Sequence, residues 1–364
     1  MRTIQYDPLN KVGRNPDLVL QSRISDYKPY LLKDLLYKDR KLIDGWDKNR
    51  SIYLIEDWPF FERYRIRSVN RNRDNRHIGK IIDLVRQTIH NKGPLSSIDL
   101  EFDKKIDWSW SPTRAARATL ESMQTGGELI IFNRIGTRKI YDFTEKHLPD
   151  VVLNQPDPNK TDEDFIKWLV YRRIGSIGLM WNRSGDGWLG FHDIKKKDRS
   201  RAISELLKEG KLIDVSIEDI NTPFYIKSDK EELLKSILIK DQNNKKAFII
   251  APLDNLLWDR KLVKELFGFE YVWEVYKPAN ERQFGYYVLP ILYNDKFIAR
   301  FEPVYNSKKK ELVVKNWWWE LGINQKNFID AIKDCLKDFM KYLGATKIKI
   351  YDKKIAKCLD DYPN

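Results

Sequence analysis

One order of predicted elements occurs twice in the chain, roughly 80 residues apart, and this repeat constrains the fold more than any other feature. Apolar residues recur at helical spacing over Ile78–His90 and again over Thr161–Gly175. Each stretch leads through a turn into a second helix, which ends at a glycine in Gly126–Ile130 and in Glu209–Ile213. Two strand-like runs joined by a turn follow in both copies. This is the order of a winged helix, so we predict tandem winged-helix modules.

The whole chain divides into four predicted segments, which together give an α+β fold. Residues 1–76 form a partial first winged-helix module, residues 77–150 the second and residues 159–240 the third. Residues 244–364 differ, because strand-like runs with turns between them dominate, one of them over Tyr271–Tyr276. We predict a small β-barrel there, then a C-terminal helix over Gln325–Leu343 and a last strand over Lys347–Tyr351. Trp317–Trp319, which precede this helix, are expected in the core rather than stacked on a nucleobase.

The charge balance favours a polyanionic partner. The chain has 66 Lys and Arg residues against 53 Asp and Glu residues, which gives a formal net charge of +13. Nucleic acid is the commonest partner of such a basic protein, although a lysine-rich solvated surface explains the charge as well. Winged helices also mediate protein contacts, so the predicted fold does not decide between these explanations.

Composition excludes several other classes of protein. Hydrophobic residues make up 42% and charged residues 33% of the chain, as in a globular protein. No apolar run reaches the ~18 residues that span a membrane. The N-terminal residues lack the apolar core of a secretory signal. We therefore expect a cytoplasmic, nucleoid-associated protein without a membrane partner.

The sequence contains little that would indicate a metal or cofactor site. Two cysteines and four scattered histidines argue against a disulfide framework and a metal site. No phosphate-binding loop or dinucleotide fingerprint occurs, so no cofactor is expected. The nearby glycines Gly185, Gly187 and Gly190 indicate a loop.

A series of distinctive motifs begins at Ala251–Arg260, whose sequence is APLDNLLWDR. It continues with Leu266–Phe269, Trp273–Tyr276 and Arg282–Pro290. In this order the motifs closely resemble the winged-helix DNA glycosylase family that unhooks DNA interstrand crosslinks, and the resemblance covers essentially the whole chain. It implies a repair enzyme for duplex DNA with alkylated or crosslinked purines, which works in an open basic channel rather than by base flipping. No metal, organic cofactor or obligate protein partner is implied.

The family's catalytic signature is Gln-x-Gln or Gln-x-Asp ahead of an arginine-containing helix. Gln5 and Asp7 match the second form and Val19–Arg23 matches the helix, so the resemblance implies that this pair carries the chemistry. An alkylated purine is cationic and leaves readily, so what remains is to stabilise an oxocarbenium-like sugar and to deliver water. A carboxylate does both, and an amide orients the water. No lysine nucleophile is needed, so a monofunctional glycosylase is expected.

Without the resemblance, the favoured interpretation of Asp7 and Pro8 is a turn and that of Gln5 is a polar end residue. Family members carry a further segment before this motif, so we expect an incomplete first module or a start farther upstream. A frayed chain end could not hold catalytic geometry. The family often has a histidine where this chain has Asp47, which leaves the role of that position open.

Several further residues are candidates for binding or support. Basic residues near these elements are possible phosphate contacts or solvated charges, namely Arg23, Arg50, Arg63, Arg65, Arg67, Arg114 and Arg117. Within the APLDNLLWDR motif we favour a structural role at the mouth of the barrel for Asp254, Asn255, Trp258, Asp259 and Arg260.

Two alternative functions stay open. A winged-helix regulator without catalysis would bind DNA and release no base. A nuclease would need clustered carboxylates for Mg²⁺, and the sequence offers only the Asp254 and Asp259 pair, which fits a structural role better.

Overall fold

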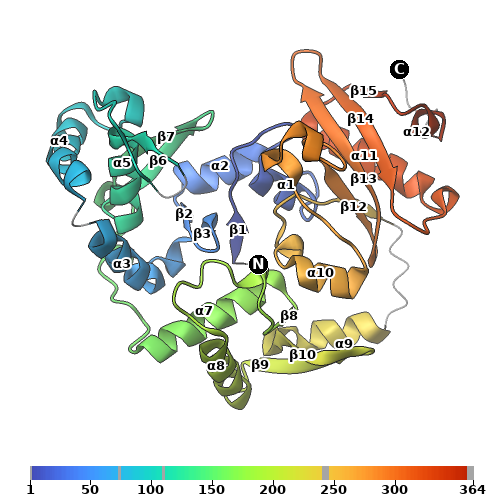
Figure 1. Cartoon of the computed structure of the whole chain (residues 1–364), viewed down its shortest axis with the longest axis horizontal. Helices are drawn as coiled ribbons and strands as arrows, with labels where there is room; N and C mark the ends of the chain where they lie inside the picture. Colours follow the sequence, from blue (N-terminus) through green and yellow to red (C-terminus); the bar gives the residue numbers. More distant parts are fainter. Residues whose placement is uncertain (1, 73–74, 109–110, 240–245, 359–364) are drawn as a thin grey trace. The chain divides into compact units, whose positions relative to one another are not determined.

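The computed structural model describes residues 2–72, 75–108, 111–239 and 246–358. The chain consists of two compact units (Figure 1). The first unit combines Met1–Leu31 with Ile166–Asn364, and the second unit is Leu32–Phe165. The four predicted segments are therefore distributed over two units, and the predicted boundary at residues 240–244 lies outside the described residues.

The second unit contains the elements predicted for residues 77–150 and part of the predicted first module. Its elements are most of α2 (Pro29–Tyr37), β2 (Leu42–Trp46), β3 (Arg50–Leu54), α3 (Glu62–Asn72), α4 (Arg76–Lys92), β4 (Lys105–Ile106), β5 (Thr113–Arg114), α5 (Ala115–Gly126), β6 (Leu129–Ile135), β7 (Arg138–Phe143) and α6 (Asp150–Leu153). Val85 and Ile89 of α4 share a buried cluster with Leu120 of α5, as their helical spacing predicts. Gly127 ends α5 at φ +88°, a left-handed conformation that other residues adopt only at a cost.

The first unit contains the elements predicted for the third and fourth segments. They are β1 (Thr3–Gln5), α1 (Asn15–Gln21), most of α7 (Asp162–Ile177), β8 (Met180–Trp181), α8 (Lys196–Lys208), β9 (Leu212–Ile217), β10 (Ile220–Lys227), α9 (Glu231–Ile239), β11 (Ala247–Ile249), α10 (Arg260–Phe267), β12 (Leu289–Tyr293), β13 (Lys296–Asn306), β14 (Glu311–Trp319), α11 (Ile329–Leu343), β15 (Lys347–Ile350) and α12 (Lys353–Cys358). The predicted helices and hairpins are confirmed here too, and β8 adds a third strand beside β10.

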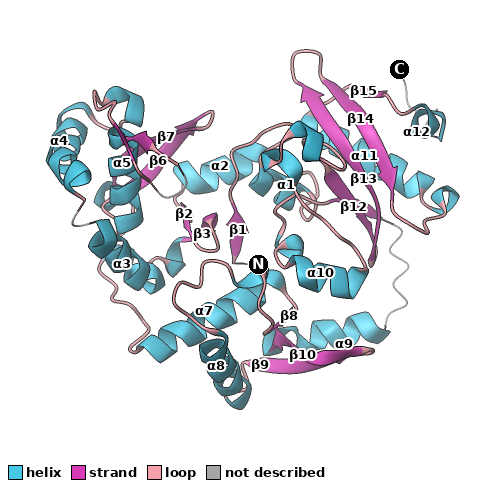
Figure 2. Ribbon diagram, in the orientation of Figure 1, coloured by secondary structure: helices cyan, strands magenta, loops and turns pink. Residues whose placement is uncertain are grey.

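The largest sheet has the order β11-β12-β13-β14-β15 and forms a half-barrel, so the predicted barrel is confirmed as a partly closed sheet. Its strands pair antiparallel except β14 with β15, which run parallel because α11 connects them. Helix α11 packs against this sheet (Figure 2). Its residues Ile332, Leu336 and Phe339 are buried in the core. Of the three tryptophans predicted in the core, Trp317 belongs to it and Trp319 is partly buried against it. Trp318 is half-buried and contacts the ring of Phe284 instead, so the prediction is wrong at that position.

The strand predicted over Tyr271–Tyr276 is wrong. This stretch is a loop that ends in a 3-10 turn over Glu274–Tyr276. Tyr271 and Trp273 are buried and Val272 is exposed, which produces the alternation of a strand without a partner strand.

The order of elements agrees with the two predicted winged-helix copies, α4-α5-β6-β7 and α7-α8-β9-β10. Their assignment as winged-helix modules stays a prediction. Over the described ranges, no helix is both long and apolar enough to cross a membrane.

Candidate active site

The segment that carries Gln5 and Asp7 is packed into the first unit. Gln5 is 7% exposed, and Thr3 and Tyr6 beside it are also buried. Asp7 follows the end of β1 and is half-buried. Its Oδ1 accepts the backbone N–H of Leu9 at 2.8 Å. The described part of this segment is therefore packed rather than frayed.

Two asparagine side chains fix the backbone of β1. Asn15, at the start of α1, donates Nδ2 to the carbonyl of Gln5 at 2.8 Å. The same side chain accepts the backbone N–H of Leu253 at 2.9 Å. Asn255 donates Nδ2 to the carbonyl of Thr3 at 3.0 Å. Both asparagine side chains therefore satisfy backbone carbonyls of β1, and Asn15 at the same time accepts an N–H from Leu253.

In the sequence, Asp254 lies between Leu253 and Asn255, which make these contacts. Asp254 is 0% exposed. Both of its oxygens accept the guanidinium of Arg23 at 2.7 Å. Oδ1 also accepts the N–H of Leu256 at 2.9 Å, so the buried carboxylate is fully hydrogen-bonded. The pair fixes the end of α1 to the loop 251–260.

The rest of the loop 251–260 also has structural contacts. Asp259 caps α10 by accepting the N–H of Leu262 at 3.1 Å, and it accepts Nε1 of Trp181 at 3.1 Å. Trp258 donates Nε1 to Leu253 at 3.1 Å, and Arg260 lies 3.4 Å from Asp186. These contacts agree with the structural role predicted for these residues.

Gly185 and Gly187 are the glycines of the predicted loop. A Cβ on either residue would come within 3.1 Å or 2.9 Å of the Asp259 carboxylate. The glycines therefore allow a close approach between this loop and Asp259, which explains the cluster without a cofactor.

The two groups predicted to carry the chemistry are the buried amide of Gln5 and the half-buried carboxylate of Asp7. Gln5 Oε1 is buried, and none of the described residues offers it a hydrogen-bond donor. Tyr276 donates its hydroxyl to Asp7 Oδ2 at 3.4 Å. Burial and the nearby charge of Asp7 raise the pKa of Tyr287, which places a second phenol in the field of this carboxylate. The arrangement offers a carboxylate that can accept a proton and an amide oxygen that can accept a hydrogen bond.

The comparison with protein families decides the class of the chain. The DNA glycosylase AlkZ-like family matches residues 1–342. The chain belongs to this family. The AlkZ-like family is one of DNA repair glycosylases, and the resemblance inferred from the motifs is thereby confirmed.

A solved structure supports the fold independently. The DNA glycosylase AlkZ of Streptomyces sahachiroi superposes with a TM-score of 0.55 at 12% sequence identity. The match covers 88% of this chain and 83% of that chain. At this level of identity the match shows that the two proteins share the fold.

The arginines predicted to contact DNA mostly have partners within their own unit of this AlkZ-like chain. Arg23 pairs with Asp254, as described above. In the second unit the pairs are Arg50 with Glu121 at 2.8 Å, Arg63 with Asp157 at 2.8 Å, Arg117 with Glu121 at 3.3 Å and Arg114 with Asp103. Arg65 donates to the carbonyl of Trp58 at 2.6 Å, and Arg67 is exposed. Their contacts with phosphate stay predictions.

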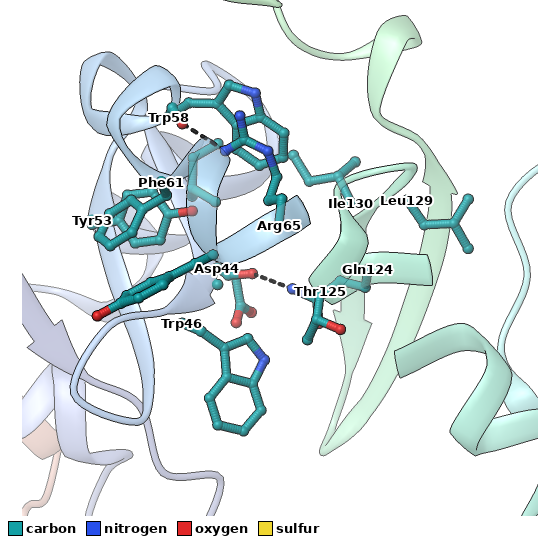
Figure 3. Close-up of a pocket in the computed structure, with 13 residues that line it drawn as sticks. Asp44, Trp46, Tyr53, Trp58, Phe61, Arg65, Gln124, Thr125, Leu129 and Ile130 are labelled. Atoms are coloured by element: carbon teal, nitrogen blue, oxygen red, sulfur yellow. Dashed lines mark hydrogen bonds between the residues drawn. The ribbon is translucent and has the colours of Figure 1, made fainter. Parts of the chain in front are cut away.

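The second unit also contains a small pocket (Figure 3). Trp46 and Trp58 contribute to its lining, and the guanidinium of Arg65 lies 4.1 Å from the centre of the Trp58 ring. Asp44 in its wall pairs with Arg134 through bonds of 2.6 and 3.0 Å. The cavity is about 50 Å³, smaller than the roughly 150 Å³ that accommodates a benzene ring. The pocket is therefore too small for a purine.

Asp47 is half-buried in the turn between β2 and β3, where its N–H donates to the carbonyl of Asn49 at 2.9 Å. Its role in the reaction stays open. No group of three or more His, Cys, Asp or Glu side chains suited to a metal occurs among the described residues. Sequence reasoning missed Asn15 and Tyr276, and the only signals were a polar residue ahead of Pro16 and a tyrosine in a family motif.

Proposed function

We propose that the chain is a monofunctional DNA glycosylase that hydrolyses the N-glycosidic bond of N-alkylated purines in duplex DNA, including crosslinked adducts. The observation that carries the proposal is the buried, unpartnered Oε1 of Gln5, judged over the described residues, two positions before the half-buried carboxylate of Asp7. Buried polar atoms are nearly always hydrogen-bonded, so this oxygen is suited to hold a water molecule.

In this mechanism Gln5 accepts a hydrogen bond from the water and Asp7 accepts its proton. The oxygen of the water forms a bond to C1′ while the bond from C1′ to the purine nitrogen breaks. The electron pair of that bond neutralises the cationic base, which leaves without an added proton. The negative charge of Asp7 stabilises the oxocarbenium-like sugar before it accepts the proton. The products are a free alkylpurine and an abasic sugar.

Because the base is a good leaving group, the reaction needs no amine nucleophile and no Schiff base. The DNA strand should therefore stay intact after base release. We further propose that α4-α5-β6-β7 and α7-α8-β9-β10 are winged-helix modules that bind the duplex of the nucleoid. The net charge of +13 favours such binding.

The test is release of N7-methylguanine from a methylated duplex, followed by release from a nitrogen-mustard crosslink. Asp7→Asn should abolish release from both, and the exposed Asp295→Asn in the turn between β12 and β13 should leave it unchanged. Alkali should be needed to cleave the strand at the product. Full activity of Asp7→Asn would refute the assigned chemistry. Duplex binding without release would favour a regulator, and strand scission without base release a nuclease.

A further inference from the structure

Tyr276 is an exposed aromatic residue in contact with the proposed catalytic carboxylate. It is 81% exposed, and its hydroxyl donates to Asp7 Oδ2 at 3.4 Å. Large aromatic side chains in contact with a polar site and open to solvent are typical of binding surfaces. In structures without substrate, hydrogen bonds of a reaction site are often long and shorten when the complex forms.

The loop that carries Tyr276 is held firmly by a buried carboxylate. Glu274 accepts the N–H groups of Gln283 at 3.1 Å and of Phe284 at 2.9 Å, and the ammonium of Lys277 at 2.9 Å. Burial alone would raise the pKa of Glu274, but the donors from Phe284, Lys277 and Gln283 outweigh it and lower the pKa to about 2. The carboxylate therefore ties the two ends of this loop together. Tyr276 is exposed on an ordered support, as a residue that presents a surface to a ligand requires.

The surroundings of Tyr276 are basic and aromatic. Tyr286, at the end of the same loop, has the ammonium of Lys11 at 5.4 Å and the guanidinium of Arg282 at 4.9 Å from its ring centre. Arg282 also donates to the carbonyl of Lys277 at 3.0 Å. Tyr286 is half-buried, whereas Tyr276 is exposed. Lys277 and Arg282 in the loop of the exposed Tyr276 suit nucleic acid, because phosphates pair with cations and bases stack on an exposed ring.

We propose that Tyr276 acts on the reaction through both ends of its side chain. Its hydroxyl is a positioning group: with Leu9 N–H on Oδ1 and Tyr276 on Oδ2, the plane of the Asp7 carboxylate is fixed. Its ring is a specificity determinant that stacks on the cationic alkylated base. This inference rests on the proposed glycosylase function and assigns a further residue to its site.

The two roles predict different kinetic effects. A cationic base is held by the ring before the bond breaks and loses its charge as it leaves, so stacking strengthens binding of the damaged duplex and not the chemical step. Orientation of the carboxylate acts on the chemical step. Loss of the ring should therefore weaken binding, and loss of the hydroxyl alone should slow base release.

The experiment compares Tyr276→Phe and Tyr276→Leu with Tyr351→Leu, which removes another exposed tyrosine with a lysine, Lys349, over its ring. Single-turnover release and Kd are measured with N7-methylguanine duplex, and Kd is also measured with unmodified duplex. Tyr276→Phe should release base about tenfold more slowly with unchanged Kd. The acid limb of the pH–rate profile of this variant should move to higher pH, because the Asp7 carboxylate holds its proton more tightly when it loses a hydrogen-bond donor.

Tyr276→Leu should weaken binding of the methylated duplex by about 5- to 30-fold and leave the unmodified duplex unaffected. Equal weakening of both duplexes would overturn the stacking role, and an unchanged rate and pH profile of Tyr276→Phe would overturn the positioning role. If the wild-type chain releases no base, the proposed function fails. The comparison of the two Kd values still decides whether Tyr276 recognises the cationic base.

Discussion

Replacement of Asn15 by alanine tests whether backbone contacts hold the proposed catalytic segment in place. The Asn15 side chain is 1% exposed. It donates to Gln5 O at 2.8 Å and to Leu253 O at 3.4 Å, and it accepts from Leu253 N at 2.9 Å. Alanine removes all three contacts and leaves the buried carbonyl of Gln5 and the N–H of Leu253 without these partners.

The magnitude follows from the two short bonds. A buried backbone group left unsatisfied costs about 1–3 kcal/mol, so the loss of partners at two groups should lower the free energy of unfolding by about 2–6 kcal/mol. A displacement of about 1 Å in a reacting group costs about 100-fold in rate, so base release should slow by a factor of that order. Urea unfolding followed by tryptophan fluorescence measures the first quantity, and single-turnover release of N7-methylguanine measures the second.

Asn10→Ala is the matched control, because Asn10 is exposed and its side chain accepts a local N–H from Gly13 at 2.9 Å. It should change stability by less than about 1 kcal/mol and leave release unchanged. An Asn15→Ala protein with wild-type stability and wild-type release would refute the reasoning, because β1 would then be held by other contacts. A stable protein with slow release would show that the contact serves geometry more than folding.

Two further predictions concern buried carboxylates of the first unit. Asp254→Asn should lower the free energy of unfolding by about 3 kcal/mol, because Arg23 loses a bidentate partner in a buried site; equal urea midpoints of variant and wild type would contradict this. The pKa of Glu274 is lowered from its usual 4.5 to about 2, so its stabilisation is complete above pH 4.5 and is lost as the pH falls towards 2. The loss should amount to about 3 kcal/mol, and Glu274→Gln should lack this part of the acid dependence in urea titrations from pH 5 to 2.

Local patterns in the sequence were sufficient for most helices and hairpins. Ile81, Val85 and Ile89 repeat at helical spacing and are buried along one face of α4. The same reasoning failed at Tyr271 and Trp273, where burial alternates although the backbone has no partner strand. Alternation of apolar and polar residues indicates which side chains are buried, but it does not identify the hydrogen-bond partners of the backbone.

Long-range pairs could not be predicted in this way. Arg23 was a candidate for phosphate contact, and its partner Asp254 lies 231 positions farther along the chain. Charge and residue type gave no signal that these two groups meet, because only the fold brings α1 to the loop 251–260. Asn15 was missed for the same reason, since its partner Leu253 is 238 positions away.

The motif that carries the family resemblance most specifically and the motif proposed for the chemistry are parts of one structure. In the loop 251–260, Leu253 pairs with Asn15, Asp254 with Arg23 and Asn255 with the carbonyl of Thr3. None of these contacts requires the loop to touch DNA, yet each fixes the backbone on one side of Gln5 or in α1. The proposed catalytic pair lies in and just after a strand of three residues, which needs such distant partners because so short a strand cannot order itself. Residues 251–260 therefore resemble the family strongly because they support the proposed site. The Gln-x-Asp signal is weaker because the proposed reaction needs only a few atoms.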